Sequence, residues 1–131
     1  DCDVIQADGG TRTAAITGAW LALHDACETW RVAGKLKSSP LLDRVAATSI
    51  GLVDGELLLD LDYSEDSRAE IDMNVVTDSH GRFVEVQGTG ERTTFDRARL
   101  DSMLDLAQAG TARLLEIQRS LIEEGSLTYG F

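Results

Sequence analysis

An Asp-Gly pair between two apolar runs is the feature that most constrains the fold of this chain. Asp54 and Gly55 separate residues 45–53 from residues 56–62, and both runs are rich in aliphatic side chains. An Asp-Gly pair favours a two-residue turn whose twist matches that of antiparallel strands. The pair therefore predicts a β-hairpin in the middle of the chain.

The remaining elements are expected to extend this hairpin into one sheet. Residues 71–77 and 82–87 read as a second strand pair, the polar residues 63–69 as a loop, and residues 88–91 as a turn. Residues 1–7 read as a first strand, and helical spacing predicts helices over 13–33 and 97–124. The expected fold is α+β with the order β-α-β-β-β-β-α: a two-layer arrangement with both helices on one face of the sheet.

The two helices carry more detailed expectations. Thr11 or Thr13 can cap the first helix, whose first half is apolar nearly all round and should be buried on more than one side. Gly110 is expected to loosen the middle of the final helix. Trp20 and Trp30 are expected in the core or in a subunit contact.

Size and charge limit the class of protein. The 131 residues fit a single domain, and 43% apolar residues are enough for a core. Twelve basic against 23 acidic residues give a net charge of −11, which excludes a free-standing basic nucleic-acid binder. It does not exclude an RNA enzyme whose basic surface lies on another segment or subunit.

Cysteine content and hydropathy indicate the expected cellular compartment. Cys2 and Cys27 make neither a disulfide scaffold nor a zinc site, and they read as small buried hydrophobes in a reduced, cytoplasmic protein. No apolar run has the length of a membrane span. His24 and His80 have no Ser or Cys neighbour that would suggest a catalytic triad, so they read as structural or exposed.

A glycine-rich turn before the first helix suits an anion. In Gly9-Gly10-Thr11-Arg12, glycines allow close approach to the backbone, the helix N-terminus offers N–H groups and positive potential, and Arg12 can contact phosphate. The alternative is a tight turn with a solvated Arg12. The spacing matches neither a Walker A loop nor the dinucleotide fingerprint.

An acidic stretch is the second candidate site. Six carboxylates fall between residues 60 and 72 beside a lone Arg68, and their mutual repulsion would be relieved by a cation. Hard oxygen ligands suit Mg²⁺ or Mn²⁺, with Asp66 and Asp72 placed to meet at a loop–strand junction. The alternative is a solvated acidic loop.

Three motifs, taken together, resemble the ribonuclease PH family. They are residues 2–19 (CDVIQADGGTRTAAITGA), residues 60–67 (DLDYSEDS) continuing to 72–76 (DMNVV), and residues 83–91 (FVEVQGTGE). The resemblance covers essentially the whole chain, in order, but only the C-terminal half of the family's sequences. With the absence of an initiator Met, this suggests that a preceding segment exists, which would carry the RNA-binding basic residues and another phosphate-site arginine.

The resemblance implies a fold and an activity. The fold would be the ribosomal protein S5 domain 2-like type. The activity would be a phosphate-dependent 3′-to-5′ exoribonuclease that trims tRNA precursors, with related rRNA processing, releasing nucleoside diphosphates by reversible nucleotidyl transfer. Family members assemble as a hexameric ring, a trimer of dimers.

The resemblance also assigns roles to residues. Gly10, Thr11 and Arg12 would bind inorganic phosphate, the co-substrate, and Asp66 and Asp72 would hold the catalytic Mg²⁺ or Mn²⁺. The catalytic set would therefore be Arg12, Asp66 and Asp72. Two alternatives stay open: a non-catalytic RNA-binding or scaffolding subunit of a ring-shaped RNA-degrading assembly, and a metal-dependent hydrolase that uses water.

Overall fold

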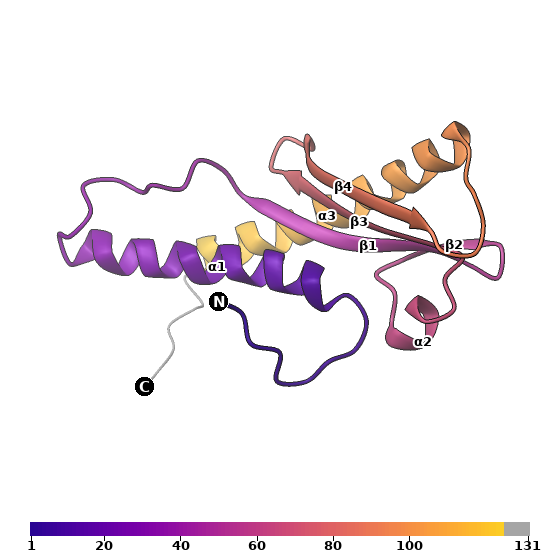
Figure 1. Ribbon diagram of the computed structural model, residues 1–131. Coiled ribbons are helices and arrows are strands. Elements are labelled where there is room, and N and C mark those ends of the chain that lie inside the picture. Colours follow the sequence, from indigo (N-terminus) through magenta and orange to yellow (C-terminus); the bar gives the residue numbers. More distant parts are fainter. Residues whose placement is uncertain (125–131) are drawn as a thin grey trace.

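The computed structural model describes residues 1–124 of the chain and contains one four-stranded sheet with two long helices (Figure 1). The strands lie in the order β2-β1-β3-β4, and every neighbouring pair is antiparallel. In chain order the elements are α1 (Thr11–Val32), β1 (Val45–Val53), β2 (Glu56–Leu59), α2 (Tyr63–Asp66), β3 (Ile71–Asp78), β4 (Phe83–Gly90) and α3 (Arg97–Glu123).

The core lies between the sheet and α3. Alternate residues of β1 and β3 face this helix and are fully or almost fully buried, as period-two alternation requires. Met103 and Ala107 of α3 are 0% exposed and pack against them. The core residues on the sheet side are Ile50, Leu52, Ile71, Met73 and Val75. The opposite set of β3 residues, which includes Asp72 and Asn74, therefore faces away from α3.

Helix α1 lies against the first half of β1, where β2 does not reach (Figure 1). The Thr17 hydroxyl bonds both backbone groups of Ala47: it accepts from the amide at 3.0 Å and donates to the carbonyl at 3.3 Å. The buried Gln118 of α3 donates to the carbonyls of Val45 and Thr17 at 3.0 and 3.1 Å. Side chains thus satisfy the part of the β1 edge that no strand covers.

The structure confirms the α+β class, the central hairpin and both long helices, and it corrects several details. Residues 1–7 are exposed and form no strand. A strand requires a hydrogen-bonded neighbour, and residues 1–7 find none in the part of the chain that is described. The single domain expected over 1–131 includes residues 125–131, which lie outside the described residues.

The strand and loop boundaries also differ from expectation. The expected loop 63–69 contains the short helix α2, and β2 ends at Leu59 because Asp60 adopts a positive φ of 60°. Strand β4 runs through the expected turn to Gly90 because Gly88 and Thr89 pair with Met73 and Asp72.

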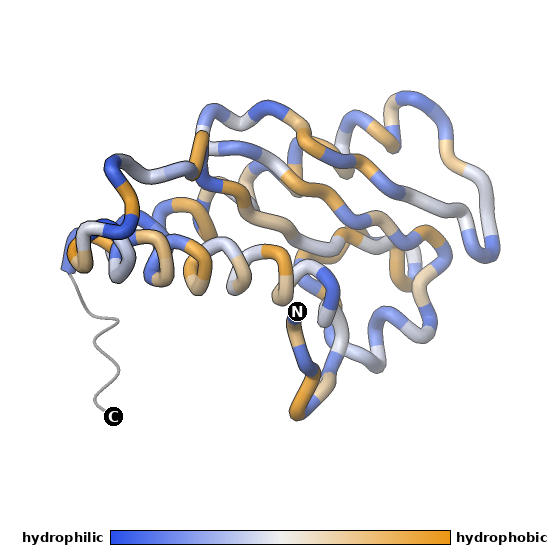
Figure 2. The backbone as a smooth tube through the Cα atoms, turned by 60° about the vertical axis from the view of Figure 1, so that its left-hand side comes forward, coloured by the Kyte–Doolittle hydropathy of each residue, from blue (hydrophilic) through white to orange (hydrophobic). Residues whose placement is uncertain are grey.

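The two long helices each correct an expectation. The first half of α1 is not buried on several sides: Thr13 is the one buried residue among residues 11–22, and Ala14 and Ala19 are exposed. Farther along the helix, Leu23, Trp30 and Val32 are exposed as well. Figure 2 shows hydrophobic stretches along α1. Because apolar residues are spread around the helix, their spacing does not indicate which of them the sheet covers. Gly110 does not loosen α3, which is continuous there; its missing side chain admits Leu59, because a Cβ would lie 2.7 Å from Leu59 Cδ1.

Candidate active site

The glycine turn before α1 packs closely against the segment that follows β2. A Cβ on Gly9 would lie 2.1 Å from the carbonyl oxygen of Leu61, so only glycine fits. The Asp8 carboxylate accepts hydrogen bonds from the amides of Gly9 and Tyr63, at 2.9 and 2.7 Å. The predicted anion-binding turn is therefore tied directly to the acidic segment.

Gly10 is the N-cap of α1 and gives it no side-chain cap. Its φ of 68° lies in the left-handed region, where glycine carries no steric penalty. Thr11 and Thr13, the expected caps, do not cap the helix: Thr11 is its first residue, and the Thr13 hydroxyl donates to the Gly10 carbonyl at 2.9 Å. An uncapped N-terminus keeps its first N–H groups available to an anion.

Arg12 extends from the first turn of α1 to strand β4. Its Nη2 donates to both carboxylate oxygens of Glu85, at 2.8 and 2.9 Å. Both side chains are close to half exposed, at 48% and 40%. Sequence reasoning missed Glu85, because 73 residues separate it from Arg12 and no local pattern links the two.

The two predicted metal ligands lie close enough to influence each other. Asp66 ends α2, whose capping box joins Asp62 and Glu65. Asp72 is half-buried on β3. Burial raises the pKa of Asp72 above its ordinary value, and the negative charges of Asp66 and Glu91 raise it further. The structure therefore adds a third carboxylate, Glu91, to the surroundings of the pair.

Strand register places both candidate regions on the sheet face away from α3. Asp72 pairs with Gly51 and Thr89, and Glu85 pairs with Val76. Asp72 and Val76 are four residues apart on one strand, a separation of roughly 13 Å. The acidic pair and the Arg12–Glu85 contact are thus brought to one face without direct contact.

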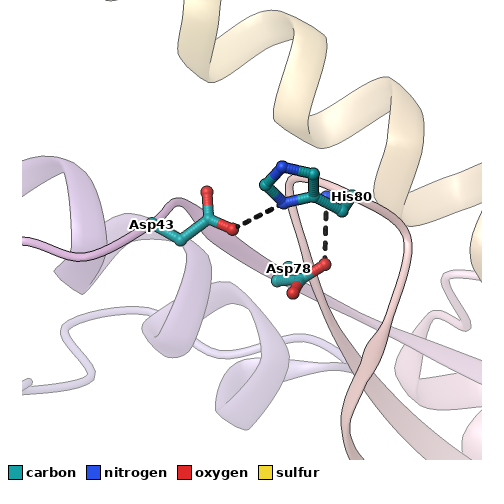
Figure 3. Close-up of side chains that lie close together, drawn as sticks. All are labelled: Asp43, Asp78 and His80. Atoms are coloured by element: carbon teal, nitrogen blue, oxygen red, sulfur yellow. Dashed lines mark hydrogen bonds and ion pairs between the residues drawn. The ribbon is translucent and has the colours of Figure 1, made fainter.

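A second group of potential metal ligands joins Asp43, just before β1, to Asp78 and His80 at the turn between β3 and β4 (Figure 3). One ligand atom from each of Asp43, Asp78 and His80 falls within 4.8 Å of the others. His80 Nδ1 lies 3.1 Å from Asp43, and the His80 amide donates to Asp78 at 2.9 Å. Ser79 also donates to Asp43 and Arg82 to Asp78.

These contacts explain the group without an ion. The Ser79 hydrogen bond is the main cause that lowers the pKa of Asp43. Burial alone would raise the pKa of Asp78, but hydrogen bonds from the amide and guanidinium of Arg82 lower it below its ordinary value. The group is a turn network, and His80 is exposed in it, in line with the structural interpretation made from the sequence.

Comparison with known proteins identifies the family. The model of domain 2 of the 3′ exoribonuclease family matches residues 43–110. The chain belongs to the 3′ exoribonuclease family, as its motifs suggested.

The curated relatives carry a more particular name. Ribonuclease PH of Synechococcus sp. (strain CC9605) is 60% identical over 126 residues, which cover 96% of this chain and 51% of the relative. Ribonuclease PH of Corynebacterium glutamicum (strain R) is 58% identical over 122 residues, covering 93% of this chain and 50% of the relative. The chain thus spans about half the length of the curated relatives it matches.

A solved structure supports the fold. The crystal structure of rice (Oryza sativa) Rrp46 superposes with a TM-score of 0.69 at 20% identity, covering 92% of this chain and 51% of that one. At this identity the likeness concerns the fold alone, and it agrees with the expected S5 domain 2-like class. None of the described helices meets the length and hydropathy needed to cross a membrane.

Proposed function

We propose that this chain is the C-terminal catalytic half of a phosphate-dependent 3′-to-5′ exoribonuclease that trims the 3′ ends of tRNA precursors. The observation that carries the proposal is the shared face of the sheet. Arg12, from the uncapped N-terminus of α1, bonds Glu85 on the sheet face that carries Asp72, and Asp66 lies near enough to affect the pKa of Asp72. The curated relatives of the chain are named Ribonuclease PH.

The proposed reaction is an in-line displacement at phosphorus. An oxygen of inorganic phosphate attacks the terminal phosphodiester, the 3′ oxygen of the shortened RNA leaves, and the last nucleotide departs as a nucleoside 5′-diphosphate. Phosphoryl transfer depends on alignment and charge neutralisation more than on covalent help. Gly10, Thr11 and Arg12 would supply the alignment, through backbone N–H groups and a guanidinium.

The carboxylates fit a hard divalent cation. Asp72 is half-buried, and the neighbouring Asp66 and Glu91 disfavour its charge, a repulsion that bound Mg²⁺ or Mn²⁺ would relieve. Asp66 and Asp72 would hold the ion, which when bound neutralises charge on the scissile phosphate and the leaving oxygen. Without such neutralisation, this acidic face would repel RNA.

The partners belong to the same proposal. The RNA 3′ end and inorganic phosphate are the proposed substrates, with RNA held mainly by basic residues outside this chain, whose net charge is −11. A hexameric ring, a trimer of dimers, is the proposed assembly. The exposed Leu23, Trp30 and Val32 of α1 support further protein contacts. The cytoplasmic, reduced setting stays a prediction.

Identifying the released nucleotide tests the activity. The longest natural polypeptide that carries this chain is incubated with Mg²⁺ and an RNA bearing a single-stranded 3′ tail, with and without phosphate. Diphosphates that appear only with phosphate support phosphorolysis. Monophosphates formed without phosphate mean a hydrolase, and the absence of any product from a folded protein means a scaffolding subunit.

Three substitutions test the site. Arg12→Ala is expected to raise the KM for phosphate, whereas Asp66→Asn and Asp72→Asn should lower turnover about 100-fold or more, as losing an electrostatic stabiliser does. Asp101→Asn is the matched control, because Asp101 is an exposed α3 carboxylate paired with Arg97. Mn²⁺ binding followed by electron paramagnetic resonance gives a second readout. Unchanged Mn²⁺ affinity in both site variants would refute the metal assignment.

A further inference from the structure

The contact between Arg12 and Glu85 uses one particular nitrogen. Nη2 of Arg12 donates to both oxygens of the Glu85 carboxylate, at 2.8 and 2.9 Å. Nε and Nη1 donate to no group within residues 1–124. The guanidinium is therefore held through a single atom.

That nitrogen decides how the guanidinium can bind an oxyanion. A guanidinium binds phosphate through two parallel N–H groups, either Nε with Nη2 or Nη1 with Nη2. Nη2 has one N–H group on each of these two edges, so a carboxylate with both oxygens against Nη2 occupies at least one edge and crowds the other. An anion that reaches Arg12 while Glu85 holds Nη2 therefore meets the carboxylate at that nitrogen, and the two compete for it.

Charge acts in the same direction as geometry. Glu85 is negative, and phosphate carries one to two negative charges at neutral pH, so the two repel when they share one cation. The pair is accessible to a competitor, because its side chains are 48% and 40% exposed. Exposed ion pairs are weak, so an anion that also gains the N-terminus of α1 can displace the carboxylate.

We propose that Glu85 competes with inorganic phosphate for Nη2 of Arg12 and thereby sets the affinity of the enzyme for its co-substrate. This inference rests on the proposed function, in which Arg12 binds phosphate. Glu85 acts through Arg12 and on phosphate binding, not on the chemical step. When phosphate is bound, Arg12 is released from β4.

Phosphate titration of the longest natural polypeptide tests the proposal. The dissociation constant for inorganic phosphate is measured by calorimetry for the wild type, Glu85→Gln and Glu85→Ala. Both variants are expected to bind phosphate about two- to fivefold more tightly, the range that corresponds to an exposed ion pair. The KM for phosphate should fall by the same factor while kcat and the KM for RNA stay unchanged, a split that a merely structural role would not produce.

The control is Glu28→Gln. Glu28 is a partly exposed carboxylate on the same helix, and its Oε2 accepts from Nε and Nη2 of Arg31. Its loss changes the net charge equally and should leave phosphate affinity unchanged. In an Arg12→Ala background, Glu85→Gln should have little effect.

The outcomes separate this inference from the proposed function. Weaker or unchanged phosphate binding in Glu85→Gln and Glu85→Ala, with Arg12→Ala still impairing binding, would overturn the competition alone. Phosphate affinity that does not respond to Arg12→Ala would overturn the phosphate assignment of Arg12 and the competition with it.

Discussion

The carboxyl group of Asp43 joins the start of β1 to the turn between β3 and β4. It accepts from Ser79 and lies 3.1 Å from His80 Nδ1. Because the hydrogen bond from Ser79 lowers the pKa of Asp43 below its ordinary value of 3.8, the ionised form stabilises the fold. That contribution is present above the unfolded pKa and is lost as the pH falls through the folded pKa.

We therefore expect Asp43→Asn to weaken the dependence of the free energy of unfolding on pH under acidic conditions. As the pH falls from about 5 through the folded pKa of Asp43, which lies below 3.8, the free energy of unfolding should fall more steeply for the wild type than for the variant, because the wild type loses an ionised acceptor. Urea unfolding at several pH values measures both slopes, with Asp101→Asn as an exposed control. Parallel slopes for wild type and Asp43→Asn would contradict the role given to Asp43.

The backbone at Gly51 lies so close to Leu61 that a side chain at position 51 would overlap it. A Cβ there would lie 2.4 Å from Leu61 Cδ2 and 3.3 Å from the carbonyl oxygen of Ile71. Leu61 is only 2% exposed and packs with Val53 and Ala69, so it has little room to move.

Gly51→Ala is expected to lower the free energy of unfolding by about 1–3 kcal/mol, the usual cost of overpacking. Gly18→Ala is the opposite case: nothing lies within 4 Å of its Cβ position in α1, so the better helix propensity of Ala should add about 1 kcal/mol. Urea denaturation compares the two variants. A Gly51→Ala variant as stable as the wild type would show that Leu61 can relax.

At the scale of elements, the first half of β1 is bordered by side chains in place of a strand. The Thr17 hydroxyl hydrogen-bonds both backbone groups of Ala47, and Gln118 donates to the Val45 carbonyl. Thr17→Val keeps the shape of the side chain but leaves the amide and the carbonyl of Ala47 without this partner. We expect a loss of about 1–3 kcal/mol in the free energy of unfolding, the cost of an unsatisfied buried group.

Thr29→Val provides the comparison, because Thr29 is exposed near the end of the same helix and its hydroxyl donates no hydrogen bond among residues 1–124. Equal stability of the two variants would mean that water satisfies Ala47 when Thr17 cannot. Hydrogen exchange at the Ala47 amide gives a local readout of the same bond.

Elements governed by local chemistry could be predicted from the sequence. The Asp54-Gly55 hairpin forms because positive φ values at both turn residues suit that pair, and φ is 51° and 83° there. Asp96 caps α3 by accepting from the Arg99 amide, a role that an Asp just before a helix commonly takes. The turn before α1 could be predicted for the same reason, because its positive φ falls on Gly10, a residue type that tolerates it.

Features that depend on distant partners could not be predicted. Residues 1–7 have strand-like composition, but a strand needs a neighbour, which composition does not supply. The Arg12–Glu85 contact depends on the β3–β4 register, which shifts between Val76 and Thr77. A one-residue slip reverses the face on which each side chain lies, so the sequence alone could not place Glu85 beside Arg12.

At the scale of the whole molecule, net charge works against the compact state. A charge of −11 on 131 residues gives self-repulsion, which salt largely screens between charges more than about 10 Å apart at 0.1 M. The ion pairs that salt would weaken are mostly exposed and contribute little. Screening of repulsion should therefore outweigh the loss of ion pairs.

We expect the melting temperature of residues 1–131 to rise when NaCl is increased from low to physiological ionic strength. Differential scanning calorimetry in NaCl and in KCl would separate screening from effects of a particular ion. A fall in melting temperature would mean that the exposed ion pairs stabilise the fold more than their exposure suggests. A further rise with Mg²⁺ at constant ionic strength, absent in Asp72→Asn, would report the proposed cation site.

The Asp8 carboxylate, bonded to the Tyr63 amide, has a consequence for how this domain can vary. Gly9 also lies against the Leu61 backbone. The length of the turn before α1 must therefore match the length of the segment after β2. A residue inserted into either would shift it against the other and change the spacing between helix terminus and carboxylates. Insertions are better accommodated elsewhere, in the exposed loop between α1 and β1, where a change in length moves neither.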